Sequence, residues 1–282
     1  MRWQRGRRST NVDDRRGRTT RRAVAGGGVG MIILAVIAMF LGVDPRTVMQ
    51  IGGQLTGGQQ TQQAPPSPEQ DQEAEFVKVV LADTEDTWHP IFKQMGREYV
   101  EPTLVLFSGA TQSACGYADS AMGPFYCPGD QQVYIDLNFY QEMKNKFGAP
   151  GDFAQAYVVA HEVGHHVQTI LGISEQVQRA KRQATQVQAN AIQVRMELQA
   201  DCFSGVWAHH AHRARQVLEE GDIEEGLTAA AAIGDDTLQR KAQGYVVPES
   251  FTHGTAKQRQ TWFMRGLRSG DINQCDTFSG DI

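Results

Sequence analysis

The order of apolar and polar positions divides the chain into an apolar run, a polar spacer and a folded region. Residues 23–43 form 21 consecutive positions without a charge, the length that one transmembrane helix needs. A cleaved signal peptide is the alternative, but no small-x-small pair follows the apolar core, so we favour an uncleaved anchor. Residues 44–74 are rich in Gln, Gly, Pro, Ser and Thr. Such a segment buries too little apolar surface to fold, and we predict a disordered linker.

Residues 75–282 have the periodicities of one domain of mixed structure. Apolar residues recur at helical spacing over most of it, and Asp152 is the expected N-cap of a central helix that Gly172 ends. Two short segments have the composition of strands. The expected helices are 76–95, 152–171, 174–212 with a break near Asn190, 223–243 and 256–267, and the expected strands are 103–107 and 132–137. These elements predict an α+β fold, mainly helical, with a small β-sheet.

The net charge of −5 over 282 residues hides an uneven distribution. Residues 1–22 hold nine Arg and two Asp, which leaves 18 basic and 30 acidic side chains in the rest of the chain. An acidic body repels phosphates, so we do not expect a nucleic-acid partner. By the positive-inside rule the basic arm, residues 1–22, stays in the cytoplasm. We therefore expect a single-pass protein of the inner (cytoplasmic) membrane with its folded domain in the periplasm or outside the cell.

All four cysteines follow the predicted span. An even number of cysteines in an exported domain is typical of disulfides formed in an oxidising compartment. Four cysteines allow three connectivities, and proximity along the chain favours Cys115 with Cys127, which leaves Cys202 with Cys275. A cysteine zinc knuckle is disfavoured because the chain has no C-x-x-C.

The central predicted helix contains His161-Glu162-Val163-Gly164-His165, which matches the pattern H-E-x-x-H. Residues four apart lie on one face of a helix, so both imidazoles can reach one metal ion. Glu162 is angled to reach a water molecule at that ion and to act as a general base. A pair of structural histidines is the alternative. The position in the middle of a helix, beside the small Gly164, favours zinc.

A catalytic zinc also needs a third protein ligand. The metzincin pattern would continue with Gly at position 168 and His at 171, where this chain has Gln168 and Leu171, so that class is excluded. Glu197, among apolar and small neighbours, is the predicted third ligand. Asp201 lies one turn further on the same face, where it could accept a hydrogen bond from the other nitrogen of a zinc histidine. The alternative, two surface carboxylates, is disfavoured by these neighbours.

Two further features have open interpretations. Hydrolysis of an amide places negative charge on the former carbonyl oxygen, which needs a hydrogen-bond donor. His253 lies in an expected loop before the last helix and could be this donor or an ordinary loop histidine. The pair Asp235-Asp236 could bind a ligand or brace helices, and we favour bracing because paired carboxylates are most often solvated.

Taken in order, these segments resemble the neutral zinc metallopeptidase family of bacterial membrane-anchored proteins, the YpfJ-like group. The resemblance covers nearly the whole chain, from Met1-Arg2-Trp3 through the zinc helix to Thr252-His253-Gly254-Thr255. The pattern is also similar to that of gluzincin membrane proteases, in which a Glu-x-x-x-Asp helix supplies the third ligand and a late Thr-His segment lies at the cleft. This chain differs from those proteases in having one predicted span, so no intramembrane chamber is implied.

The resemblance implies a zincin-like domain over residues 75–282 that binds one Zn2+. It assigns the metal ligands to His161, His165 and Glu197 and the catalytic roles to Glu162 and His253. It also implies that the strand around Tyr134 lies along the cleft, where a peptide could add as a β-strand. We therefore expect a membrane-anchored zinc metalloendopeptidase of the bacterial envelope, with peptide or protein substrates. The alternative is a zinc-stabilised, non-catalytic scaffold that binds envelope partners through the same cleft.

Overall fold

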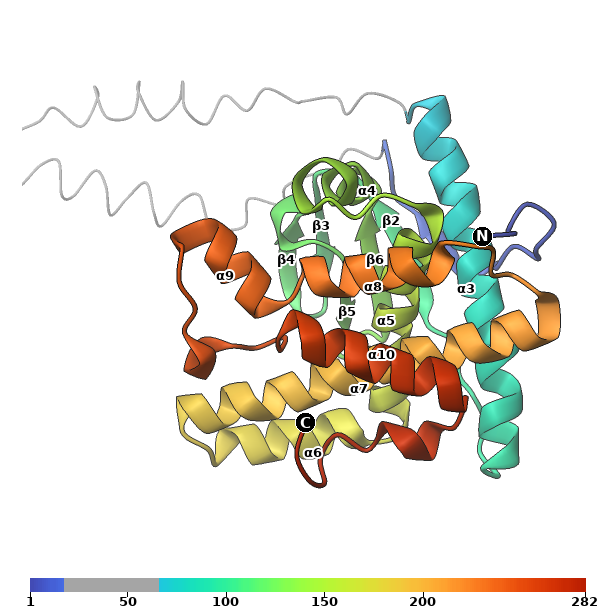
Figure 1. The fold of residues 1–282 in the computed structure, drawn as a ribbon. Helices are drawn as coiled ribbons and strands as arrows, with labels where there is room; N and C mark the ends of the chain where they lie inside the picture. Colours follow the sequence, from blue (N-terminus) through green and yellow to red (C-terminus); the bar gives the residue numbers. More distant parts are fainter. Residues whose placement is uncertain (18–65) are drawn as a thin grey trace, which may run out of the picture. The chain divides into compact units, whose positions relative to one another are not determined.

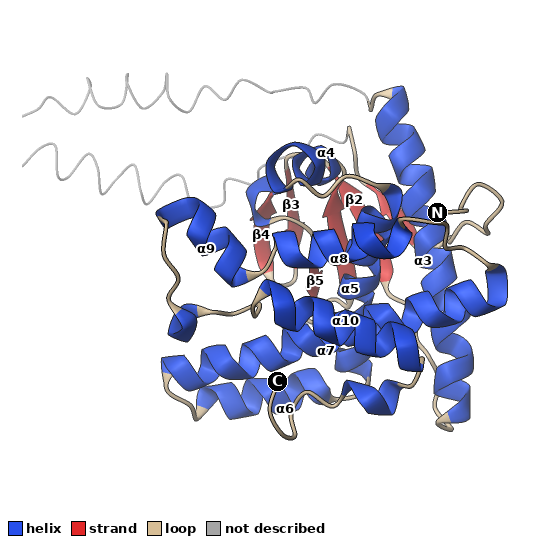
Figure 2. Cartoon of the chain, in the orientation of Figure 1, coloured by secondary structure: helices blue, strands red, loops and turns tan. Residues whose placement is uncertain are grey.

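The helix with the H-E-x-x-H pattern, α5 (Asp152–Ile170), packs against a small sheet and against four other helices, two of them longer than itself. The computed structural model describes residues 1–17 and 66–282, and residues 1–16 and 66–282 form one compact unit (Figure 1). Helices predominate and the strands gather in one region of this unit (Figure 2). The predicted α+β class, mainly helical with a small sheet, is confirmed.

The sheet has four strands in the order β1-β2-β6-β5. β1 (Val12–Asp14), β2 (Thr103–Phe107) and β6 (Gln132–Asp136) are parallel, and β5 (Phe125–Cys127) pairs antiparallel with β6 at the edge. A separate hairpin joins β3 (Ala110–Ser113) to β4 (Gly116–Asp119). Tyr134 therefore lies on an interior strand that already has two neighbours. The expectation that a peptide could add to this strand is wrong, because both of its sides are already paired, and β5 is the edge strand that lines the cleft.

The two longest helices of the described residues begin at side chains that cap them. Ser67 and Thr185 each form a capping box with the glutamine three residues later, at the starts of α3 (Pro68–Gln94) and α7 (Gln186–Arg215). The remaining helices are α4 (Asn138–Glu142), a π-helical turn (Met143–Phe147), α6 (Ile173–Arg182), α8 (Asp222–Ala232), α9 (Asp235–Gln243), α10 (Ala256–Ser269) and 3-10 turns at Ser120–Met122, Pro248–Ser250 and Ile272–Cys275.

Several predicted boundaries are corrected. α3 begins at Pro68, inside the predicted linker 44–74, because proline is tolerated at the first position of a helix. The break between α6 and α7 lies at residues 183–185 rather than near Asn190. The predicted helix 223–243 is two helices separated at residues 233–234, and Gly151 takes the N-cap position expected for Asp152.

Residues 1–16 of the basic N-terminal segment are part of the folded unit, which corrects the prediction of a separate arm over this part of residues 1–22. β1 pairs with β2, and the Met1 ammonium lies 2.6 Å from Asp152 Oδ1 and 3.3 Å from Asp222 Oδ1. The buried Glu85 accepts hydrogen bonds from Arg7, Ser9 and Asn11. A bilayer cannot separate segments that share one sheet. Residues 1–16 and the domain therefore cannot lie on opposite sides of a membrane in this fold, whereas residues 18–22 of the predicted arm lie outside the described residues.

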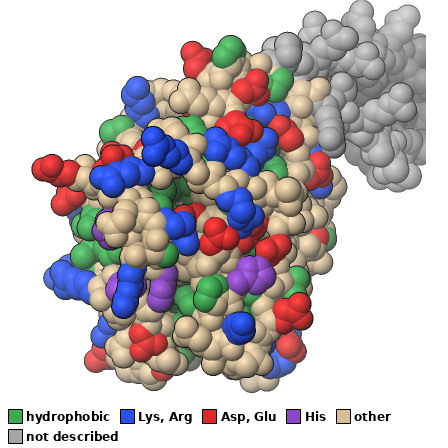
Figure 3. Space-filling view, turned by 90° about the vertical axis from the view of Figure 1, so that its right-hand side faces the viewer, with side chains coloured by type: hydrophobic (Ala, Val, Ile, Leu, Met, Phe, Trp, Pro, Cys, Tyr) green, Lys and Arg blue, Asp and Glu red, His purple; other side chains and the backbone are tan. Residues whose placement is uncertain are grey.

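Charged side chains of both signs are interspersed on the face in Figure 3. Three arginines of the N-terminal segment form ion pairs with acidic side chains of the domain: Arg7 with Asp86, Arg8 with Glu75 and Arg2 with Glu219. Acidic side chains of the domain thus neutralise part of the positive charge of the N-terminal segment.

The predicted span lies outside the described residues. Within residues 1–17 and 66–282, no helix combines the length and the apolar character that a membrane crossing requires.

The two disulfides are those favoured by proximity, Cys115–Cys127 and Cys202–Cys275. The second ties α7 to the C-terminal segment across 73 residues.

We predict that Glu85→Ala lowers the free energy of unfolding by about 2 kcal/mol, because three donors of the N-terminal segment lose a buried acceptor. Urea unfolding measures this change. The matched control is Asp86→Ala, which removes an exposed partner of the same arginine and should cost less than about 1 kcal/mol. Equal effects of the two substitutions would contradict the buried role of Glu85.

Candidate metal centre

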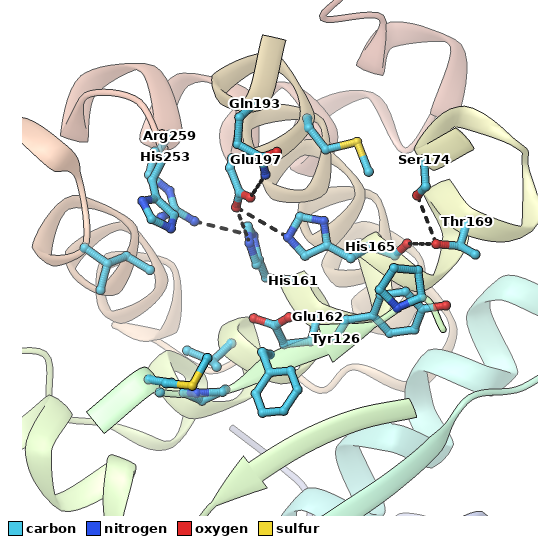
Figure 4. Close-up of a pocket in the computed structure, with 18 of the residues that line it drawn as sticks. Tyr126, His161, Glu162, His165, Thr169, Ser174, Gln193, Glu197, His253 and Arg259 are labelled. Atoms are coloured by element: carbon cyan, nitrogen blue, oxygen red, sulfur yellow. Dashed lines mark hydrogen bonds and ion pairs between the residues drawn. The ribbon is translucent and has the colours of Figure 1, made fainter. Parts of the chain in front are cut away.

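Three side chains from two helices converge on one point (Figure 4). His161 and His165 project from α5, and Glu197 projects from α7. Glu197 Oε2 lies 3.2 Å from His161 Nε2 and 3.4 Å from His165 Nε2. Zinc bonds of about 2.0–2.1 Å in a tetrahedron place two ligand atoms about 3.3 Å apart. The three residues therefore have both the chemistry and the spacing of a zinc donor set.

A close crossing of α5 and α7 produces this convergence. A Cβ atom on Gly164 would lie 3.0 Å from the carbonyl oxygen of Ala200 and 3.1 Å from its Cα. Because any larger residue would push the helices apart, the glycine lets the carboxylate of Glu197 reach the imidazoles. α10 also packs closely on α7, where a Cβ on Gly266 would overlap the carbonyl oxygen of Cys202 at 1.9 Å.

The other ring nitrogen of each histidine has a buried partner. His161 Nδ1 is 2.9 Å from Asp201 Oδ1, and His165 Nδ1 is 2.9 Å from Gln168 Oε1. An oxygen acceptor at Nδ1 keeps the proton there and leaves the Nε2 lone pair for a metal. Asp201 lies at its predicted place, beside a histidine of the motif.

Two glutamines hold this arrangement, and neither is predicted from the sequence. Gln168 is fully buried, and its Nε2 donates to the carbonyl oxygen of Met196 at 2.7 Å and to Gln199 Oε1 at 3.1 Å. Gln193 Nε2 donates to Glu197 Oε1 at 2.7 Å, which leaves Oε2 facing the histidines. A signal for Gln168 existed: it follows His165 by three residues, so both lie on one helix face.

A buried arginine compensates the charge of Asp201. Arg259 Nε and Nη2 each donate to Asp201 at 2.9 Å, and the hydroxyl of Tyr157 donates to the same carboxylate. Arg259 is also absent from the residues predicted for the site. Its signal in the sequence is its spacing: Arg259 precedes Trp262 by three residues and Phe263 by four, which places a charged residue on the apolar face of α10.

The carboxylates control protonation of the cluster. Burial alone would lower the pKa of His161, but Asp201 and Glu197 outweigh it and raise this pKa to about 9. Burial alone would raise the pKa of Glu197, but His165 and His161 hold it well below its usual value. A metal ion that binds here therefore displaces protons from the imidazoles.

The donor set opens into a cleft of about 910 Å³. Glu162 is mostly buried at the base of this cleft, across from Glu197 in Figure 4. His253 also lines the cleft, and its side chain is half exposed. The structure thus brings the two predicted catalytic residues to the same cleft as the three predicted ligands.

Asp235 and Asp236 brace the loop that holds His253. Asp235 Oδ2 accepts backbone N–H groups of Thr252, His253 and Gly254 at 2.6–3.0 Å, and Asp236 Oδ1 accepts that of Ala256 at 2.8 Å. Asp235 Oδ1 also lies 3.2 Å from His253 Nδ1. Both carboxylates thus brace this loop, as the favoured interpretation expected.

His166, next to the H-E-x-x-H motif, connects α5 to the edge strand β5 through a hydrogen bond. His166 is buried, with Nε2 2.6 Å from the carbonyl oxygen of Val100 and Nδ1 3.1 Å from the hydroxyl of Tyr126. Since a carbonyl only accepts, Nε2 carries the proton and Nδ1 accepts from Tyr126. This contact places β5 along one wall of the cleft.

Comparison with known proteins agrees with this geometry. Residues 1–278 match the model of a family described as "Putative neutral zinc metallopeptidase". The chain belongs to this family. It is 51% identical over 291 residues to the uncharacterized protein YpfJ of Escherichia coli K12, with 100% of both chains covered. It is 43% identical over 214 residues to the uncharacterized protein Rv2575 of Mycobacterium tuberculosis H37Rv, covering 72% of this chain and 71% of the relative. No solved structure matches the chain.

We predict that Gln168→Leu weakens zinc binding about ten- to a hundredfold, because His165 loses the acceptor that orients its ring. Competition against a chromogenic chelator measures the affinity. Glu197→Ala, which removes a ligand, should have a larger effect, and Gln176→Leu on the exposed surface of α6 should have none. Wild-type affinity in a folded Gln168→Leu protein would show that Gln168 does not orient the site.

Proposed function

We propose that this family member is a zinc metalloendopeptidase that binds one Zn2+ through His161, His165 and Glu197. The observation that carries the proposal is the spacing of these three ligand atoms at the base of an open cleft, with Glu162 beside them. The charges also fit: Glu162, Glu197 and Asp201 carry three negative charges, which a divalent cation and Arg259 balance. A buried site of this kind is stable only when its charges are paired.

Zinc in this site would polarise the scissile carbonyl and make water a stronger acid. Glu162 takes the proton from the attacking water and transfers it to the leaving amine. The hydrogen bond with Asp235, which outweighs burial, raises the pKa of His253. This favours an imidazolium that donates from both nitrogens, so His253 can stabilise the oxyanion while Asp235 holds its ring.

The substrate lies along the cleft as an extended strand. β5 is an edge strand of the sheet, and its residues Phe125 and Tyr126 line the cleft. A peptide added to this edge gains main-chain hydrogen bonds that do not depend on its sequence. The scissile bond then falls between the metal ligands and β5.

We predict that Glu162→Gln abolishes peptide hydrolysis and leaves one zinc bound, because the amide cannot take a proton and no ligand is changed. Fluorogenic-peptide assays measure activity, and metal analysis of the purified protein measures zinc. Retention of hydrolysis by the variant would remove Glu162 from the proposed mechanism. A zinc-loaded wild-type protein that cleaves no peptide of a broad library would support a non-catalytic scaffold instead.

We also propose that the domain lies outside the cytoplasm and that residues 23–43 attach it to the membrane. The two disulfides support the oxidising compartment. Because residues 1–16 belong to the same compact unit, the proposal places them on the same side of the bilayer as the domain.

Thiol alkylation of intact cells after acid quenching tests this location. We expect all four cysteines to be protected from the reagent until the protein is reduced. Four free thiols in the native protein would place the domain in a reducing compartment, whereas protection of both pairs agrees with export.

A further inference from the structure

The cleft has different chemistry at its two ends. Most apolar side chains of the cleft come from β5, from the N-terminal half of α5, and from the π-helical turn and the segments around α4 and α9, where the rings of Phe139 and Phe147 lie in contact: Met122, Phe125, Phe139, Phe147, Val158, Ile233 and Leu238. Of the polar side chains on this side, Glu142 pairs with Lys146 at 2.7 Å, Arg259 with Asp201 and His253 with Asp235. The lining beside the C-terminal half of α5 carries hydroxyl, amide and carboxylate groups at Thr169, Ser174, Glu175, Gln178 and Gln193, together with the apolar Val177 and Met196.

The metal ligands separate these two ends. Val158 and Thr169 are 11 residues apart on α5, which corresponds to about 16 Å along the helix axis, and His161 and His165 lie between them. An extended peptide covers this distance with about five residues. In Figure 4, Thr169, Ser174 and Tyr126 lie on one side of the ligands, and His253 and Arg259 lie on the other.

The direction of β5 decides which part of a substrate meets each end. Gly123, just before β5, lies against Phe139 at the apolar end: a Cβ there would be 3.5 Å from the ring. Tyr126 lies on the same side of the ligands as Thr169 and Ser174 of the polar end (Figure 4). β5 therefore runs from the apolar end to the polar end. Antiparallel pairing is the more stable arrangement, so a peptide on this edge runs the opposite way.

We infer that this cleft selects substrates with a large apolar side chain directly after the scissile bond and polar side chains before it. A peptide antiparallel to β5 passes the polar end first and the apolar end last. The apolar wall then receives the side chain on the leaving-amine side. This inference rests on the proposed peptidase function and specifies the class of peptide that it accepts.

Digestion of a proteome-derived peptide mixture by the zinc-loaded full-length protein tests the inference. We expect Leu, Ile, Met and Phe to be enriched at least about fivefold directly after the cut, and no such enrichment before it, since apolar pockets discriminate by about ten- to a hundredfold. Enrichment before the cut, or none on either side, would overturn it. Phe147→Ala should lower the preference for Phe over Ala after the cut about tenfold, whereas Val187→Ala, exposed on α7 and outside the cleft, should not change it.

A binding experiment tests the inference even if no peptide is cut. Two peptidyl hydroxamates, in which the hydroxamate replaces the scissile carbonyl, would carry a benzyl or a hydroxymethyl side chain at the next position. Calorimetry on the zinc-loaded protein should show about tenfold tighter binding of the benzyl compound, and this difference should shrink in Phe147→Ala. Equal affinities would overturn the inference. Absence of hydrolysis together with the expected difference would refute only the peptidase activity.

Discussion

The close contact between α5 and α7 is the constraint on which the rest of the site depends. Gly164 permits the approach, and α7 then brings Glu197 toward the two histidines of α5 and Asp201 beside the first of them. Residues 161 and 201 are 40 positions apart in the chain, so neither helix could form this cluster alone. A side chain at position 164 would separate the helices and, with them, the metal ligands from their supports.

Burying several charged groups in one place is costly unless each group has a partner. Here the partners come from a third helix: Arg259 of α10 donates two hydrogen bonds to Asp201, and Tyr157 donates another. α10 packs on α7 without space for a side chain at Gly266. The Cys202–Cys275 disulfide adds a covalent link next to Asp201. The same packing that stabilises the fold thus keeps the ligands in place.

The cleft depends on a second set of contacts, between the sheet and α5. His166 follows the proposed ligand His165 in the chain and binds Tyr126 of the edge strand. The position of β5 relative to the proposed ligands is therefore set by a residue of the same helix, α5. The N-terminal segment completes the other edge of the same sheet through β1. The positions of both edge strands, β1 and β5, thus depend on contacts that the sequences of these short strands do not show.

The sequence by itself determined the elements with local causes. The i, i+4 histidines of α5, the helices with a clear apolar period, the strands β2 and β6 and the fold class all follow from spacing and composition within a few turns of chain. Glu197 and Asp201 were also accessible, because carboxylates among small apolar residues are unusual on a surface.

Only the tertiary structure decided the features that need partners distant in sequence. β1 and β5 are three residues each, too short for a periodic signal, and they exist because neighbouring strands offer them hydrogen bonds. The basic segment has the composition of a separate arm because its acidic partners lie on α3, more than 60 residues away. Gln168, Gln193 and Arg259 acquire their roles from the groups they meet across helix interfaces. A residue's hydrogen-bond partner is a property of the packed fold, and local sequence does not encode it.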